Sequence, residues 1–91
     1  MWRNLYGVLA ILCSLPGYAL NDQQVRETIE QMIITDQRVR DPQTLDIKAL
    51  QQADQAHALQ LKQIIDDYGV PRYSVLGKKT ADDFLTLVLH L

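Results

Sequence analysis

The sequence predicts a small all-α domain that follows a secretory signal peptide. Apolar residues recur every three or four positions over two long stretches, which is the spacing of one face of an α-helix. Helix caps and breakers separate these stretches, and the N-terminal apolar run is too short to cross a membrane. The chain has 91 residues, enough for one small domain. We therefore expect three helices over about 22–41, 44–68 and 80–91, after a signal peptide at 1–19.

The N-terminal segment has the layout of a signal peptide. The single charge Arg3 precedes an eleven-residue, mostly apolar run over 5–15, which a proline–glycine pair ends. Gly17 and Ala19 place small residues at −3 and −1 of a cut after Ala19. Because eleven residues fall well short of the roughly 20 that span a bilayer, we expect cleavage and no retained membrane anchor. The mature domain, residues 20–91, would then be exported to the periplasm or the extracellular space.

Charge and cysteine usage argue against several classes of function. Cys13 lies in the segment to be removed, so the mature domain has no thiol for a disulfide or for cysteine catalysis. Loss of Arg3 takes the nine basic residues to eight, against eleven acidic ones, for a net charge of −3 with neutral histidines. This mild acidity, without a basic stripe, argues against nucleic-acid binding, which needs clustered Lys and Arg facing phosphates.

The first predicted helix spans 22–41. Asn21 or Asp22 supplies its cap, and the following Asp-Pro pair ends it, since proline disfavours helical geometry in the preceding residue. One position of its buried stripe is the carboxylate Asp36, which Arg40 can reach one turn later. The stripe consists of Val25, Ile29, Met32, Ile33, Asp36 and Val39.

The second predicted helix spans 44–68, with Thr44 as its cap and Gly69 as its left-handed stop. Its stripe is apolar except at the middle, where Asp54 and His57 interrupt it. The whole stripe is Ile47, Leu50, Asp54, His57, Leu61, Ile64 and Tyr68.

The third predicted helix follows a loop over 69–79. Thr80 with Asp83 three residues later resembles a capping box. The helix is apolar on nearly every side, with Phe84, Leu85, Leu87, Val88, Leu89 and Leu91. Such a helix should be buried all round, and two other helices can hardly enclose it. We therefore expect a further helix, a partner subunit or a membrane surface to cover residues 84–91.

The polar members of the two stripes meet if the first two helices pack together. An unpaired buried charge costs several kcal/mol, comparable with the roughly 3–5 kcal/mol of stability that so small a domain has. The groups must therefore pair, bind a ligand or lie in a solvent-filled cleft. The interpretation we favour is a paired network: Arg40 lies between Asp36 and Asp54, and His57 donates to a carboxylate.

A metal site is a second interpretation of these residues. Asp54 and His57 stand at i and i+3 on one helix face, as in the Glu-x-x-His pairs of metal-binding bundles. Asp36 and His90 could complete a two-histidine, two-carboxylate set suited to zinc or iron. Arg40 argues against it, because its charge would oppose a cation. We accordingly expect no cofactor, with a divalent metal as the alternative.

A hydrolytic site is a third interpretation. His57 or His90 would act as general base, with a carboxylate orienting it. Ser74, the only serine of the mature domain, could join His90 and Asp36, but its flanking residues lack a nucleophile-elbow pattern. We expect a protein without catalytic activity.

Short patterns in a fixed order over residues 36–90 resemble those of a known family. They are Asp36-Gln37-x-x-Arg40, Asp54, Leu61-Lys62-x-Ile64-Ile65, Tyr68-Gly69-x-Pro71, Ser74-x-x-Gly77 and His90. Their order and spacing resemble an uncharacterised bacterial family of small helical domains of unknown function. The chain departs from that family at Val70, where a tryptophan is usual, at His57, where an asparagine is common, and at Leu89, where a glutamine is usual. The resemblance implies a helical fold, a polar cluster and a missing C-terminal part, and it implies no activity.

The sequence thus predicts an exported helical protein that acts as a protein-interaction or structural module with an internal Asp/Arg/His network. Self-association or a protein partner would cover residues 84–91, and we expect neither a nucleic-acid partner nor a transmembrane span after cleavage. One alternative is a metal-binding or hydrolytic domain that uses Asp36, Asp54, His57 and His90. The other is a truncated, inactive member of the family.

Overall fold

The computed structural model of the chain describes residues 20–91, so the predicted signal peptide at 1–19 and its cleavage site after Ala19 lie outside the described residues. The described residues form helices and no strands, which confirms the predicted all-α class. The helices are α2 (Asp22–Val39), α3 (Ile47–Asp67), α4 (Tyr73–Leu76) and α5 (Lys78–Leu89). Of these described helices, none is long and apolar enough to cross a membrane.

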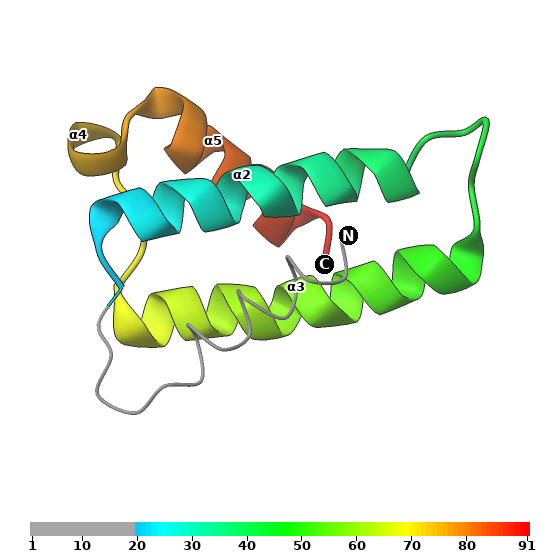
Figure 1. Cartoon of the computed structure of the whole chain (residues 1–91), viewed down its shortest axis with the longest axis horizontal. Coiled ribbons are helices and arrows are strands. Elements are labelled where there is room, and N and C mark those ends of the chain that lie inside the picture. Colours follow the sequence, from blue (N-terminus) through cyan, green and yellow to red (C-terminus); the bar gives the residue numbers. More distant parts are fainter. Residues whose placement is uncertain (1–19) are drawn as a thin grey trace.

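The long helices α2 and α3 lie side by side and run in opposite directions (Figure 1). α5 packs mainly against α2, and α4 packs against α5 and α2. In Figure 1 the C-terminal end of α5 (red) lies near the middle of the α2–α3 pair, and both long helices extend beyond it toward their connecting loop. One end of the pair is therefore covered by α4 and α5, and the other is not.

The start of α2 is fixed by Asn21, one of the two predicted caps, and it forms a capping box that was not predicted. The Asn21 side chain accepts a hydrogen bond from the Gln24 N–H at 2.8 Å, and the Gln24 side chain accepts one from the Asn21 N–H at 3.0 Å. Leu20 and Val25, on either side of the cap, are both buried in the core. This is the hydrophobic staple that sets the angle at which a chain enters its helix.

The start of α3 differs from the prediction by three residues. Thr44 is not its cap, because its backbone N–H bonds to the Asp41 carbonyl in the preceding turn. Asp46 caps the helix instead, and its carboxylate accepts from the N–H groups of Lys48 at 3.0 Å and Ala49 at 3.3 Å. The end of α3 is as predicted, since Gly69 has the positive φ of +111° that a side chain disfavours.

The segment over 69–79 is not a plain loop, as it contains the single turn of α4. The predicted start of the third helix is also wrong. α5 begins at Lys78 after Gly77, which has φ +90°, and the helix has no side-chain cap. Thr80 and Asp83 therefore form no capping box. Asp83 instead pairs with the Lys79 ammonium at 2.8 Å, one turn earlier on the same helix.

Arg26 holds α4 against α2. Its Nε donates to the Leu76 carbonyl at 3.3 Å, and its Nη2 donates to the Val75 carbonyl at 3.1 Å. These are carbonyls at the end of a helix too short to satisfy them itself. The guanidinium thus caps α4 from a helix about 50 residues earlier in the chain.

The core is concentrated at the covered end of the α2–α3 pair. α2 contributes buried residues along most of its length, whereas α3 contributes only His57, at its midpoint, and Leu61 and Ile64 in its second half. Ile47, which opens the predicted α3 stripe, is 57% exposed. Ile47 is exposed because α5 is too short to cover the whole of α3. α5, with 12 residues, is about 18 Å long, whereas α3, with 21 residues, is about 31 Å long.

Within the described residues only one side of α5 is buried, which agrees with the expectation that two other helices can hardly enclose the third. Only Ala81, Phe84 and Leu87 of α5 are buried, and they form the side that packs on the core. The other large apolar residues at its C-terminal end are exposed: Leu85, Val88, Leu89 and Leu91.

Candidate functional site

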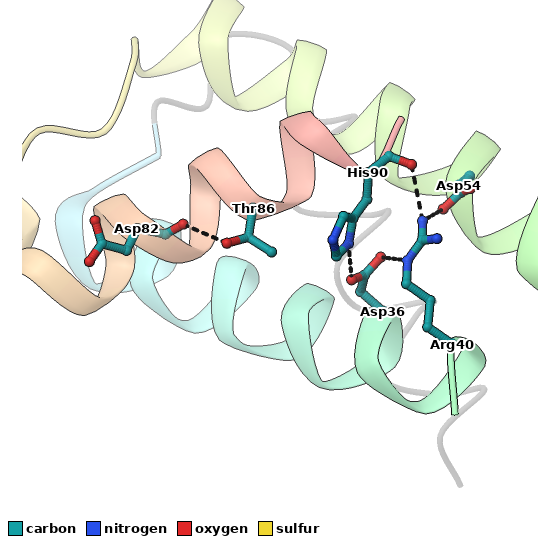
Figure 2. A network of polar contacts seen from close by, with 6 residues as sticks. All are labelled: Asp36, Arg40, Asp54, Asp82, Thr86 and His90. Atoms are coloured by element: carbon teal, nitrogen blue, oxygen red, sulfur yellow. Dashed lines mark hydrogen bonds and ion pairs between the residues drawn. The ribbon is translucent and has the colours of Figure 1, made fainter. Parts of the chain in front are cut away.

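Arg40 lies at the centre of a polar network that joins three parts of the chain (Figure 2). Its Nε donates to Asp36 Oδ1 at 3.0 Å, one turn earlier in α2. Its Nη2 donates to Asp54 Oδ1 on α3 at 2.7 Å and to the backbone carbonyl of His90 at 3.0 Å. The expected position of Arg40 between Asp36 and Asp54 is therefore observed.

Asp36 is 1% exposed, and both of its carboxylate oxygens have partners. Oδ1 accepts from Arg40, and Oδ2 lies 2.5 Å from Nδ1 of His90. Because an ionised carboxylate only accepts hydrogen bonds, Nδ1 of His90 carries the proton in this pair. A buried carboxylate with a cation and an imidazole as partners avoids the cost of an unpaired buried charge.

The same network caps the end of α5. The His90 carbonyl belongs to the last turn of a helix, where carbonyls have no partner within the helix. Arg40 supplies that partner, and its positive charge lies where the helix dipole favours a cation. Within α5, the Thr86 hydroxyl donates to the Asp82 carbonyl at 3.1 Å (Figure 2). No local pattern predicts the contact with Arg40, because the two residues are 50 positions apart.

Burial lowers the pKa of Arg40, but the hydrogen bonds and negative charges of Asp36 and Asp54 outweigh it and raise the pKa above its ordinary value. The guanidinium therefore keeps its charge at any physiological pH. Since it touches both carboxylates, it holds the position between them that a metal ion would need. Across residues 20–91 no group of three or more histidine, cysteine or acidic side chains is placed to hold a metal ion.

His57 does not take part in this network, contrary to our expectation that it donates to a carboxylate. His90 occupies that role instead. The His57 side chain is 2% exposed, and no hydrogen bond joins it to another described residue. Burial lowers the pKa of His57; Asp36 and Asp54 act against this effect, and Arg40 adds to it. The imidazole is therefore neutral at pH 7.

The proposed hydrolytic arrangement is formed in part. His90 and Asp36 are in contact, whereas Ser74 lies exposed in α4, and its hydroxyl has no hydrogen bond to either residue in the described part of the chain. The structure therefore brings together Asp36, Arg40, Asp54 and His90 from the predicted cluster, and it leaves Ser74 and His57 outside.

A groove between α2 and α3 is a feature that the sequence analysis missed. It has a volume of about 380 Å³, and His57 contributes to its lining. The α3 side is also lined by Ala49, Gln52, Ala53 and Ala56, and the α2 side is lined by Thr35, Arg38 and Val39. The spacing of the three alanines at i, i+4 and i+7 could have indicated a hollow on one face of α3.

Two tyrosines form hydrogen bonds between helix ends at the end of the α2–α3 pair that α4 and α5 cover. The Tyr68 hydroxyl donates to Asp22 at 2.5 Å, and the Tyr73 hydroxyl donates to Asp82 at 2.7 Å. Burial, together with the hydrogen bond to Asp22, raises the pKa of Tyr68. These contacts join α2 to α3 and α4 to α5, which is a structural role.

Comparisons of the chain with family models, with curated proteins and with solved structures gave no significant match. The resemblance to a family of small helical domains therefore stays a prediction.

Proposed function

We propose that the chain is an exported helical module that acts through protein contact, with a second copy of itself as the partner. The polar network around Arg40 has a structural role in this proposal. The observation that carries it is the exposed apolar surface at the end of α5, called here the α5 strip: Leu85, Val88, Leu89 and Leu91.

The α5 strip is continuous and strongly exposed. Leu85 is 52% exposed and Leu89 is 82% exposed, and they lie one turn apart, with Val88 beside them. Complete burial of a leucine or valine side chain is worth roughly 1.5–3 kcal/mol. Exposed apolar surface that is contiguous, rather than scattered, often marks a protein contact.

A second copy fits this surface because a two-fold axis brings the same patch against itself, so an apolar strip meets an apolar strip. The predicted mature domain has a net charge of −3, which would make two copies repel. Near the strip, however, the charges of α5 are already paired. Lys78 pairs with Asp82 at 2.5 Å and Lys79 with Asp83 at 2.8 Å.

The polar network around Arg40 fixes the end of the helix that carries the α5 strip. His90 follows directly after Leu89, and its carbonyl and ring are both held, by Arg40 and Asp36. A helix end without such partners frays. The Asp–Arg–His contacts therefore keep the exposed leucines in a fixed helical geometry.

The test of self-association is the mass of residues 20–91 in solution, measured by light scattering and by sedimentation at micromolar concentration. We expect a dimer for the native sequence and a monomer for the double variant Leu85→Glu with Leu89→Glu. Leu59→Glu is the control, because Leu59 is 71% exposed on α3, outside the strip. A native monomer, or a dimer that survives the double variant, would contradict the proposal.

Export is tested separately, by N-terminal sequencing of the protein recovered outside the cytoplasm of a bacterial host. We expect Leu20 as the first residue. Ala19→Arg should block the cut, because a bulky charge at −1 is not accepted at signal cleavage sites that require small residues. Retention of the uncut chain in the cytoplasm would contradict the proposal of export and leave the dimer test unaffected.

A further inference from the structure

The groove between α2 and α3 has the dimensions of a small-molecule site. Its volume of about 380 Å³ falls within the roughly 300–1,000 Å³ of ligand pockets. Ala49, Ala53 and Ala56 present methyl groups to it, so the α3 side of the groove is largely apolar, with the amide of Gln52 beside them. Ligand pockets combine such apolar walls with a few polar groups that fix the ligand's orientation.

His57 is the first of these polar groups. The side chain lines the groove, is 2% exposed, and has no hydrogen bond to another described residue. A neutral imidazole has one N–H group, which can donate a hydrogen bond to an oxygen atom of a ligand.

A buried polar atom without a partner lies one turn further along α3. Gln60 follows Ala56 at i+4 and so shares its side of the helix. Its Oε1 is buried and has no hydrogen-bond partner among the described residues. One unsatisfied polar atom therefore lies one turn beyond the alanines, next to the groove and not in its lining.

Arg38 supplies charge at the edge of the groove. It lines the groove from the last turn of α2, it is exposed, and it forms no ion pair with another described residue. This differs from Arg40, two positions later, which forms ion pairs with Asp36 and Asp54. A free guanidinium beside an apolar hollow favours an anionic head group with an apolar body, because arginine pairs with carboxylates in a two-pronged geometry.

We propose that the α2–α3 groove binds a small carboxylic acid with an apolar body. The body lies against the alanine methyl groups, and the carboxylate accepts hydrogen bonds from Arg38 and from the imidazole N–H of His57. This site is separate from the α5 strip, and its occupation does not depend on dimer formation.

The test is an NMR titration of the purified protein with octanoate below its micelle concentration, in parallel with 1-octanol. The double variant Leu85→Glu with Leu89→Glu is titrated too, so that adsorption on the α5 strip is recognised. We expect saturable shifts of the methyl groups of Ala49, Ala53 and Ala56 and of the His57 ring, in both proteins. Octanol should bind about tenfold more weakly, since it lacks the charged partner for Arg38.

Matched variants locate the site. Ala53→Leu fills the groove and should abolish the shifts, whereas Ala58→Leu, the same change at an exposed position of α3, should leave them unchanged. Arg38→Gln should remove the preference for octanoate over octanol, and Arg72→Gln at an exposed loop position should not. Because Arg38 is exposed, its variant folds even where Ala53→Leu does not.

Three outcomes would overturn the proposal. The first is the absence of saturable shifts at the alanine methyl groups. The second is octanoate binding that Arg38→Gln leaves unchanged relative to octanol. The third is a set of groove shifts that arise on dimer formation without octanoate and vanish in the double variant, which would make the groove an interface between copies.

Discussion

The two ends of the α2–α3 pair differ in almost every property, although the same two helices form both. At the covered end, where α4 and α5 pack, Val25, Ile29 and Ile64 are completely buried. At the open end, near the connecting loop, Leu45 is 50% exposed and Ile47 is 57% exposed. Helical periodicity continues through both ends, so periodicity alone does not produce a core. A third element must be long enough to cover the stripe.

The polar network lies at the C-terminal end of α5, where the packing of α5 over the α2–α3 pair ends. α5 ends at Leu89, and the next residue, His90, contacts Asp36 and Arg40. Polar groups at this boundary replace apolar packing with directed hydrogen bonds. The difference between the ends therefore predicts where substitutions are costly and where they are tolerated.

The largest expected effect compares two isoleucines of α3. Ile64→Ala should lower the free energy of unfolding by about 3–4 kcal/mol, since Ile64 is fully buried and its truncation leaves a cavity. Ile47→Ala, the same change at the open end, should stay within about 0.5 kcal/mol. Urea unfolding followed by circular dichroism measures both. Equal losses would show that the open end is packed in solution, as it would be in an assembly that covers it.

A smaller loss is expected from Arg40→Leu. This change leaves the buried Asp36 with only His90 as a partner and uncaps the end of α5. Breaking a buried pair in this way costs roughly 3–5 kcal/mol, and we expect about 2–3 kcal/mol because the Arg40 side chain is 29% exposed.

Arg38→Leu is the matched control for this prediction, because Arg38 lies on the same helix and forms no ion pair with a described residue. It should change the free energy of unfolding by less than about 0.5 kcal/mol. Hydrogen exchange of the last α5 amides provides a second measurement, which Arg40→Leu should accelerate and Arg38→Leu should not. Equal stability of the two variants would mean that the network contributes nothing to the fold.

The smallest expected effect concerns pH and His57. Burial lowers the pKa of this histidine below its ordinary value of 6.5, so below pH 6.5 the unfolded chain binds a proton that the folded chain does not. Stability that depends on a neutral His57 is therefore fully present above pH 6.5. As the pH falls from 6.5 toward the folded-state pKa of His57, this stability is lost and the free energy of unfolding decreases. Unfolding free energies of the native protein should decrease between pH 7 and pH 5.

His57→Leu removes this titration, and the decrease between pH 7 and pH 5 should become shallower while stability at pH 7 is kept or raised. The variant changes no other titratable side chain, so the difference between the two pH profiles reports on His57. Identical pH profiles for the native protein and the variant would show that His57 is hydrated in solution.

The sequence was sufficient for the parts of the site that lie within one or two helical turns. Asp36 and Arg40 stand at i and i+4 on one helix, so their contact follows from helix geometry. The choice between His57 and His90 as partner of Asp36 does not. Both histidines fall on apolar faces, and the outcome depends on where α5 ends relative to α3.

The sequence alone determined the helical class, the stop at Gly69 and the absence of a thiol from residues 20–91, and it narrowed the cap of α2 to Asn21 or Asp22, because each of these depends on neighbouring residues or on composition. The tertiary structure decided which half of the α3 stripe is buried, that Arg40 caps a helix 50 residues away, and that His57 lies in a groove. These features depend on the relative lengths of helices and on the way they pack. Such quantities belong to pairs of elements, and no local pattern encodes them.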